Sequence, residues 1–175
     1  MKLTKVERWI LANQYKILEQ VDPDNAEHYQ TMQEILEKGY ETEYRWKTQY
    51  IYDDDDVVTE EKGHYVINVL AMYDALQQSY QRLADKEGID QNALAFPGFD
   101  GNNEGEYLGY ARFLRDKEEK FTDLQVSGRD LNSHFPTLDM YNRMQNAWAQ
   151  RGGGHEMSRD DINAILTARI HPDNR

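Results

Sequence analysis

The sequence predicts an all-α fold: one compact domain over residues 1–175, with about six or seven helices packed around a central helix near residues 60–84. Three observations lead to this prediction. Apolar residues recur at steps of three and four in several long segments. Helix-capping residues stand before these segments, and glycine or proline stands after them. No segment alternates like a strand, and the four prolines all lie at proposed boundaries.

The segment 59–84 has the clearest helical period. Six apolar residues share one face: Val66, Val69, Tyr73, Leu76, Tyr80 and Leu83. Thr59 suits the N-cap, and Glu60 suits the positive end of the helix dipole. We expect Tyr73 and Leu76 to be buried against helices at 5–21 and 103–124. Gln77 is expected to lie off this buried seam, so that truncating it changes stability by only about half a kcal/mol.

The first helices should form a hairpin. Thr4 and Glu7 have the spacing of a capping box, and an amphipathic helix from 5 to 21 follows. Its apolar residues at helical spacing are Val6, Ile10, Leu11, Ile17, Leu18 and Val21. Pro23 starts the next helix, which ends at Gly39, the residue type favoured just past a helix end.

The rest of the chain is less uniform. Residues 41–58 satisfy no single period, so we expect a short helix and then a loop, with the acidic run 53–56 on a solvated connection. A long helix is predicted from about 103 to 124. Another begins near Pro136, and a last short one follows Ser158, with Asp161 in the capping-box position. Residues 171–175 form a polar tail.

Composition limits the classes of partner and location. The net charge of −12 repels phosphate backbones, which disfavours nucleic acid as a partner. Nucleic-acid binding would need a local basic face built from Arg8, Lys16, Arg112, Arg115 and Lys120. There is no cysteine and no continuous apolar segment of membrane-spanning length. We therefore expect a soluble cytoplasmic protein without membrane partners.

Several short strings stand in the order and approximate spacing of a known family. They include Asn13-Gln14-Tyr15-Lys16, Gly39-Tyr40, Gly98-Phe99-Asp100 and Tyr107-Leu108-Gly109-Tyr110. With them, nearly the whole chain resembles the YfbU family of small bacterial proteins. The similarity is weakest between Tyr44 and Tyr65. The resemblance implies a compact helical domain, and it supplies no catalytic residues because the family is essentially uncharacterised.

A candidate ligand site lies at the turn 98–100 and the following helix start. Asp100, Glu104 and Tyr107 could line a cleft there, as a small-molecule binder or an enzyme would require. The structural alternative is that these acidic residues only stabilise the start of the helix, where the helix dipole favours negative charge. The same segment resembles the first half of a calcium loop, but Ala111 stands where the bidentate acid is required. We predict no catalytic residue, no metal and no cofactor.

The aromatic residues suggest an interface. Tyr44, Trp46, Tyr50 and Tyr52 fit no core stripe, which makes them candidates for a partner or self-association surface, with simple local packing as the alternative. The leading hypothesis is therefore a non-enzymatic protein that acts through protein contacts as a homo-oligomer, with regulation as one role that such contacts would serve. The alternative is a small-ligand-binding protein or enzyme that uses the turn 98–100.

Overall fold

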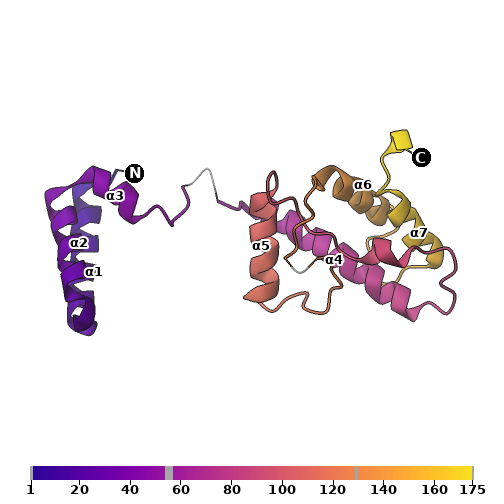
Figure 1. The fold of residues 1–175 in the computed structure, drawn as a ribbon, viewed down its shortest axis with the longest axis horizontal. Helices are drawn as coiled ribbons and strands as arrows, with labels where there is room; N and C mark the ends of the chain where they lie inside the picture. The colour runs from indigo at the N-terminus through magenta and orange to yellow at the C-terminus, as the bar shows by residue number, and fades with distance from the viewer. Residues whose placement is uncertain (1, 54–56, 129, 175) are drawn as a thin grey trace. The chain divides into compact units, whose positions relative to one another are not determined.

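The structure is a computed structural model that describes residues 2–53, 57–128 and 130–174. The all-α prediction is confirmed: these residues form seven α-helices and three short 3₁₀-helices (Figure 1). The α-helices are α1 Lys5–Val21, α2 Ala26–Lys38, α3 Glu41–Lys47, α4 Glu60–Arg82, α5 Gly105–Asp116, α6 Leu138–Ala149 and α7 Arg159–Thr167. The 3₁₀-helices are η1 Pro23–Asn25, η2 Gln91–Leu94 and η3 Pro172–Asn174.

The chain divides into two compact units, unit 1 (Met1–Asp56) and unit 2 (Val57–Arg175). Each unit has its own cluster of buried apolar residues. We describe each unit by itself, and the single domain expected for the whole chain stays a prediction. Of the acidic run 53–56, residues 54–56 lie outside the described part of the chain.

Unit 1 is a helical hairpin of α1 and α2, followed by α3, as predicted. The hydroxyl of Thr4 accepts a hydrogen bond from the Glu7 backbone, and the Glu7 carboxylate accepts one from the Thr4 backbone at 2.7 Å. This capping box satisfies N–H groups at the start of α1. Gly39 ends α2 with φ 74°, a left-handed conformation that glycine adopts without steric cost.

Hydrogen bonds join α1 to α2 along one side of the hairpin. Gln30 and Gln33 both donate to the carboxylate of Glu19, at 2.7 and 2.9 Å. Arg8 donates to the carbonyl of Leu36 at 3.2 Å. The buried apolar residues between the helices are Ala12, Met32, Ile35, Leu36 and Tyr44. The face of α1 that contains Ala12 therefore packs on α2.

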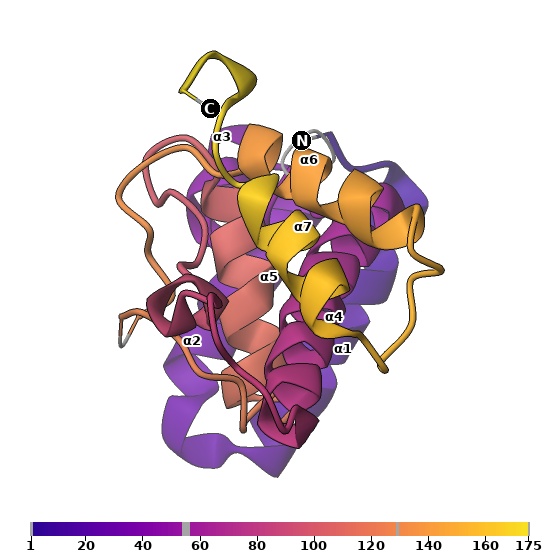
Figure 2. The same ribbon diagram turned by 90° about the vertical axis from the view of Figure 1, so that its right-hand side faces the viewer.

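Unit 2 is organised around α4, which confirms the predicted central helix. Figure 2 shows α5, α6 and α7 around it, and all three contact α4. Val66, Val69, Met72, Tyr73 and Leu76 have no exposed surface. The members of this buried cluster all lie between residues 66 and 168.

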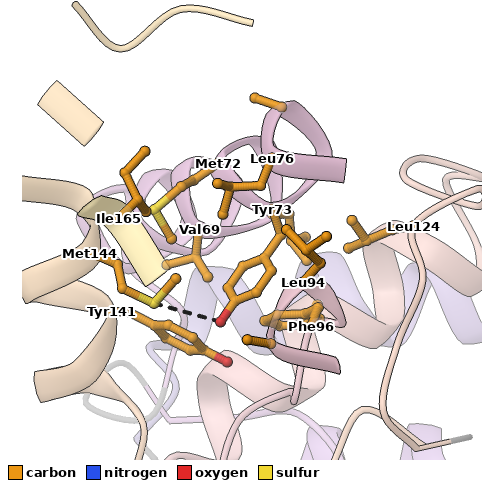
Figure 3. Packing of buried hydrophobic residues seen from close by; sticks show 14 of the residues in the cluster. Val69, Met72, Tyr73, Leu76, Leu94, Phe96, Leu124, Tyr141, Met144 and Ile165 are labelled. Carbon is orange, nitrogen blue, oxygen red and sulfur yellow. Dashed lines mark hydrogen bonds between the residues drawn. The ribbon is translucent and has the colours of Figure 1, made fainter. Parts of the chain in front are cut away.

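The centre of unit 2 is aromatic. The ring of Tyr73 lies edge-on to Phe96 and Tyr141, with centroids 5.3 and 5.8 Å away (Figure 3). Its hydroxyl points at the sulfur of Met144, at 3.6 Å. The burial predicted for Tyr73 and Leu76 is confirmed. We also expected the helix 5–21 to pack against them. No residue of α1 belongs to this buried cluster, and the buried residue of α1, Ala12, belongs to the cluster of unit 1.

The prediction for Gln77 was wrong. Gln77 is buried, and its side chain makes three hydrogen bonds to the backbone of two loops. Its amide nitrogen donates to the carbonyls of Leu94 and Gln125, both at 2.9 Å, and its amide oxygen accepts from the Gln125 N–H at 2.8 Å. Helical spacing placed this residue beside the apolar seam, but two loops cover that flank of α4.

The long helix predicted from 103 to 124 is shorter in the structure. α5 begins at Gly105 and ends at Asp116, and the chain then turns through Glu119 and Phe121, whose φ angles of 52° and 58° are left-handed. The N–H of Lys120 bonds back to the carbonyl of Leu114 at 2.9 Å, which closes the helix end. Leu124 is still buried, but it reaches the core from this irregular segment.

Candidate functional site

The turn that follows Phe96 in unit 2 passes very close to a second loop. Gly98 has φ 94°, and a Cβ atom there would lie 1.8 Å from the carbonyl oxygen of Leu131. Only glycine fits this approach. Phe99 exchanges two backbone hydrogen bonds with the same loop, donating to Leu131 at 3.0 Å and accepting from Ser133 at 3.1 Å. The turn 98–100 is therefore fixed against residues 131–133.

The carboxylate of Glu104 lies inside unit 2 and connects this turn to the start of α6. Its Oε1 accepts hydrogen bonds from the backbone N–H groups of Thr137 and Leu138, at 2.6 and 3.0 Å. Its Oε2 accepts from the N–H of Asp100 at 2.9 Å and from the hydroxyl of Thr137 at 2.7 Å. Glu104 is 4 % exposed. A buried carboxylate with four donors at a helix N-terminus is in a favourable electrostatic position.

Asp100 and Tyr107 also use their polar and aromatic groups within the fold. Asp100 is buried, and its carboxylate accepts from the N–H of Asn102 at 3.2 Å and from the side-chain amide of Asn103. The half-buried ring of Tyr107 stacks on Phe99, with centroids 5.7 Å apart. The structure thus brings Asp100 and Glu104 together, but it directs their carboxylates at the chain's own donors.

A hollow of ≈ 170 Å³ lies elsewhere in unit 2. It is lined by Val58, Thr59, Glu60, Gly63, His64, Ile67 and Tyr110. None of the three predicted ligand residues contributes to this lining. Within the described part of the chain, no three histidine, aspartate or glutamate side chains are grouped as metal ligands would be. Ligand binding by Asp100, Glu104 and Tyr107 stays a prediction, and their observed contacts are structural.

The five basic residues that a nucleic-acid surface would need each contact an acceptor within their own unit. Arg8 bonds to a carbonyl of α2, and Lys16 pairs with Glu37 at 3.3 Å. In unit 2 the pairs are Arg112 with Asp130, Arg115 with Asp116 and Lys120 with Glu118. Pairing of this kind lowers the local positive potential that phosphate binding requires.

Three of the four aromatic residues predicted to form an interface are exposed, and the interface itself stays a prediction. Trp46, Tyr50 and Tyr52 are 62 %, 79 % and 74 % exposed. The assignment of Tyr44 to this predicted interface is corrected, because Tyr44 is 4 % exposed and belongs to the buried cluster of unit 1. Two positions along α3 rotate a side chain by about 200°, so Tyr44 faces the hairpin and Trp46 lies on the other side of the same short helix.

A larger apolar surface lies on α1, where the sequence suggested core residues. Six large apolar side chains of this helix are exposed: Val6, Trp9, Ile10, Ile17, Leu18 and Val21. With Asn13 and Gln14 between them, they form one longitudinal stripe, which we call the α1 stripe. The amphipathic pattern of α1 correctly marked an apolar face, but the hairpin buries the opposite face, around Ala12.

The eight residues of the α1 stripe are uncharged, although charged residues make up 30 % of the chain, but Glu7 lies within the arc that they span on the helix. The other charged residues of α1 lie beside or behind the stripe: Lys5, Arg8, Lys16 and Glu19. The sequence signal that could have revealed the exposed stripe is the second face of α1, where Arg8, Ala12 and Glu19 recur at helical spacing. These small or polar side chains permit close contact with α2.

No helix in the described ranges is both long and apolar enough to cross a bilayer. The comparison with protein families identifies one match over almost the entire chain. A family model described as the YfbU domain matches residues 1–168. The matched range includes the four sequence strings that resemble this family, around Asn13, Gly39, Gly98 and Tyr107. The chain belongs to the YfbU family.

Proposed function

We propose that this protein acts through protein–protein contacts rather than by catalysis, and that it self-associates through unit 1. The observation that carries the proposal is the exposed apolar surface of this unit, made of the α1 stripe and the three aromatic residues Trp46, Tyr50 and Tyr52. Among the described residues of unit 1, exposed large apolar side chains outnumber buried ones. Exposed apolar surface of this extent marks interaction sites.

The free energy of burial gives this surface its driving force. Removing one large aliphatic or aromatic side chain from water contributes about 1.5–3 kcal/mol. Trp9, at 68 % exposed, and Trp46 are of the residue type most enriched at interaction hot spots. A partner that covers both the stripe and the aromatic residues would therefore gain enough to offset the entropy lost on association.

The hydrogen bonding of the other candidate site supports a non-enzymatic role. All four interactions of the Glu104 carboxylate are with groups of the chain itself. A general acid or base must instead reach a substrate atom within hydrogen-bond distance. The hydrogen bonds to the start of α6 are sufficient to explain why Glu104 is buried, so no substrate is needed to explain a glutamate at this position.

Light scattering coupled to size-exclusion chromatography tests self-association. The full-length chain should elute as a dimer or larger particle. Replacing Trp46 and Tyr50 together by alanine should weaken the association by about tenfold or more, because two exposed aromatic anchors are lost. Phe135→Ala is the matched control: Phe135 is 46 % exposed but lies in unit 2. A strictly monomeric particle at about millimolar concentration contradicts the proposal, since even weak specific dimers associate there.

We also place the protein in the cytoplasm. The absence of cysteine fits a reducing compartment, where disulfides are not used for stability. Fractionation of cells that express the full-length chain tests this assignment. Recovery in the cytosolic fraction is expected, and recovery in a membrane or periplasmic fraction contradicts it.

A further inference from the structure

The α1 stripe has the same pattern when it is read from either end of the helix. Its eight residues form four pairs, each centred on the point between Asn13 and Gln14. The pairs are Val6 with Val21, Trp9 with Leu18, Ile10 with Ile17, and Asn13 with Gln14. Apolar residues are matched in three pairs, and amides are matched in the central pair. A helix face with this symmetry is complementary to a reversed copy of itself.

We propose that α1 pairs antiparallel with α1 of a second copy of the chain, about a two-fold axis that passes beside Asn13 and Gln14. This inference rests on the proposed self-association and specifies its geometry. In a two-fold interface the same patch is used by both copies, so a contact from residue i to residue j occurs twice. Antiparallel pairing about this axis places Ile10 opposite Ile17 of the other copy, and Trp9 at the same level as Leu18 but on the other flank of the contact.

The central amides set the register of the pair. Each side-chain amide can both donate and accept, so Asn13 of one copy and Gln14 of the other can satisfy each other. A slip by one helical turn would place an amide against Ile10 or Ile17 and leave its polar atoms without partners in an apolar contact. A single polar position in an otherwise apolar helix seam is known to fix register in this way.

Charge and helix dipoles favour the same arrangement. Each copy carries a net charge of −12, so two copies repel each other at long range. The eight residues of the α1 stripe carry no charge, and Glu7, which lies within their arc, would be level with the uncharged Gln20 of the other copy. Pairing through this face therefore brings no like charges into direct contact. Antiparallel helices also place the positive end of one dipole beside the negative end of the other. Parallel pairing would instead put the two Trp9 side chains at the same level.

Large exposed apolar residues are fewer in the described part of unit 2 than on α1 alone. The large apolar residues exposed in its described part are Val57, Phe113, Phe135 and Ile170. They come from four different segments: the approach to α4, helix α5, the loop before α6 and the end of α7. Scattered single residues of this kind are normal on a protein surface. The α1 stripe, with six such residues on one helix, is therefore the apolar surface that a second copy of the chain can match.

Single-cysteine variants test the geometry, because the natural chain contains no cysteine. Full-length Ile10→Cys and Ile17→Cys are prepared separately, mixed in equal amounts, allowed to exchange subunits and oxidised with copper phenanthroline. The mixture should form covalent dimers at least about fivefold faster than either variant alone. In an antiparallel pair position 10 lies opposite position 17, whereas two positions 10 lie about 10 Å apart along the axis, beyond the reach of a disulfide.

Controls separate the possible results. Asn13→Cys, next to the proposed axis, should cross-link with itself. Glu34→Cys, exposed on α2 and outside the stripe, should cross-link with neither isoleucine variant. Each reaction is run at a concentration at which light scattering shows the reduced variant to be a dimer. One further result is a stripe variant that keeps native circular dichroism but remains a monomer while the unsubstituted chain is a dimer. This result supports the pairing, because the loss of dimerisation locates the contact on the stripe.

Three outcomes overturn the inference. Dimers that cross-link as fast from each isoleucine variant alone as from the mixture indicate parallel pairing. Dimers that do not cross-link at Asn13→Cys or in the mixture show that another surface associates, which leaves the proposed self-association intact. A monomeric unsubstituted chain at every concentration overturns both proposals together.

Discussion

At the scale of single residues, Gln77 has the clearest stabilising role that the helical period did not reveal. Gln77→Ala removes three hydrogen bonds and leaves the carbonyls of Leu94 and Gln125 without this donor. We expect a loss of about 2–4 kcal/mol in the free energy of unfolding, since a buried group left unpaired costs about 1–3 kcal/mol. Urea unfolding followed by circular dichroism measures it.

Two other substitutions in α4 provide a comparison for the stability change of Gln77→Ala. Leu76→Ala leaves a cavity in the core of unit 2 and should cost about 2–5 kcal/mol. Gln81→Ala, exposed on the same helix, should change stability by less than about 0.5 kcal/mol. Equal midpoints for Gln77→Ala and Gln81→Ala would contradict the proposed bracing of the loops by Gln77.

Tyr73 should make stability fall at alkaline pH. Burial raises the pKa of its hydroxyl above the ordinary value of 10.0, and burial raises the pKa of Tyr141 in the same way. Below about pH 10 both forms of the chain keep the proton, so this stabilising contribution is fully present. Above that pH the unfolded chain loses the proton first, and stability is lost by up to about 1.4 kcal/mol per pH unit for each tyrosine.

Tyr73→Phe isolates this effect. In the described part of the chain, the hydroxyl of Tyr73 donates to the sulfur of Met144, a weak acceptor, so its removal should cost little at neutral pH. The fall in stability between about pH 10 and 11.5 should become less steep. Tyr52→Phe, at an exposed position, serves as the comparison. An unchanged alkaline slope in Tyr73→Phe would mean that the buried hydroxyl does not titrate with unfolding.

At the scale of elements, the start of α6 depends on a residue 33 positions earlier in the chain. Thr137 stands at the N-cap position but makes no capping hydrogen bond with its own side chain. The carboxylate of Glu104 accepts the N–H groups there instead. This explains why the turn 98–104 and α6 are held as one structural piece.

Glu104→Gln tests the connection with almost no change in size. In either orientation the new amide nitrogen faces at least one backbone N–H, and the charge at the helix N-terminus is lost. We expect about 2–4 kcal/mol less stability by urea unfolding, because hydrogen bonds to a buried charged group are involved. Glu87→Gln, on an exposed loop, is the control. A fully stable Glu104→Gln variant would contradict the structural role and leave ligand binding as the better explanation of this residue.

At the scale of the whole molecule, the two units differ in how complete their cores are. The aromatic and aliphatic cluster of unit 2 is built entirely from residues of that unit. A fragment of residues 57–175 should therefore fold alone and unfold cooperatively on heating. Circular dichroism and calorimetry measure this transition, and a fragment without a cooperative transition would contradict the independence of unit 2.

The fragment 1–56 should behave differently. Its small buried cluster and exposed α1 stripe predict a helix content that rises with protein concentration, since association would supply the missing burial. Circular dichroism over a wide concentration range measures it. Helicity that is complete and independent of concentration would show that the hairpin needs no partner.

The sequence by itself determined where most helices begin and end. The capping boxes at Thr4 and Ser158 and the glycine at position 39 act through contacts within about four residues, so local patterns are sufficient to recognise them. It also identified the central helix, because a helix with a broad apolar face must be covered on several sides.

The tertiary structure alone decided which groups are buried and what they bind. Gln77 meets Gln125, and Glu104 meets Thr137, across 48 and 33 positions of the chain, distances at which no local period operates. Periodicity marked α1 as amphipathic, but only the packing of the hairpin left its apolar stripe exposed. The physical reason is that a helix period defines faces, whereas burial depends on which other segments come to cover them.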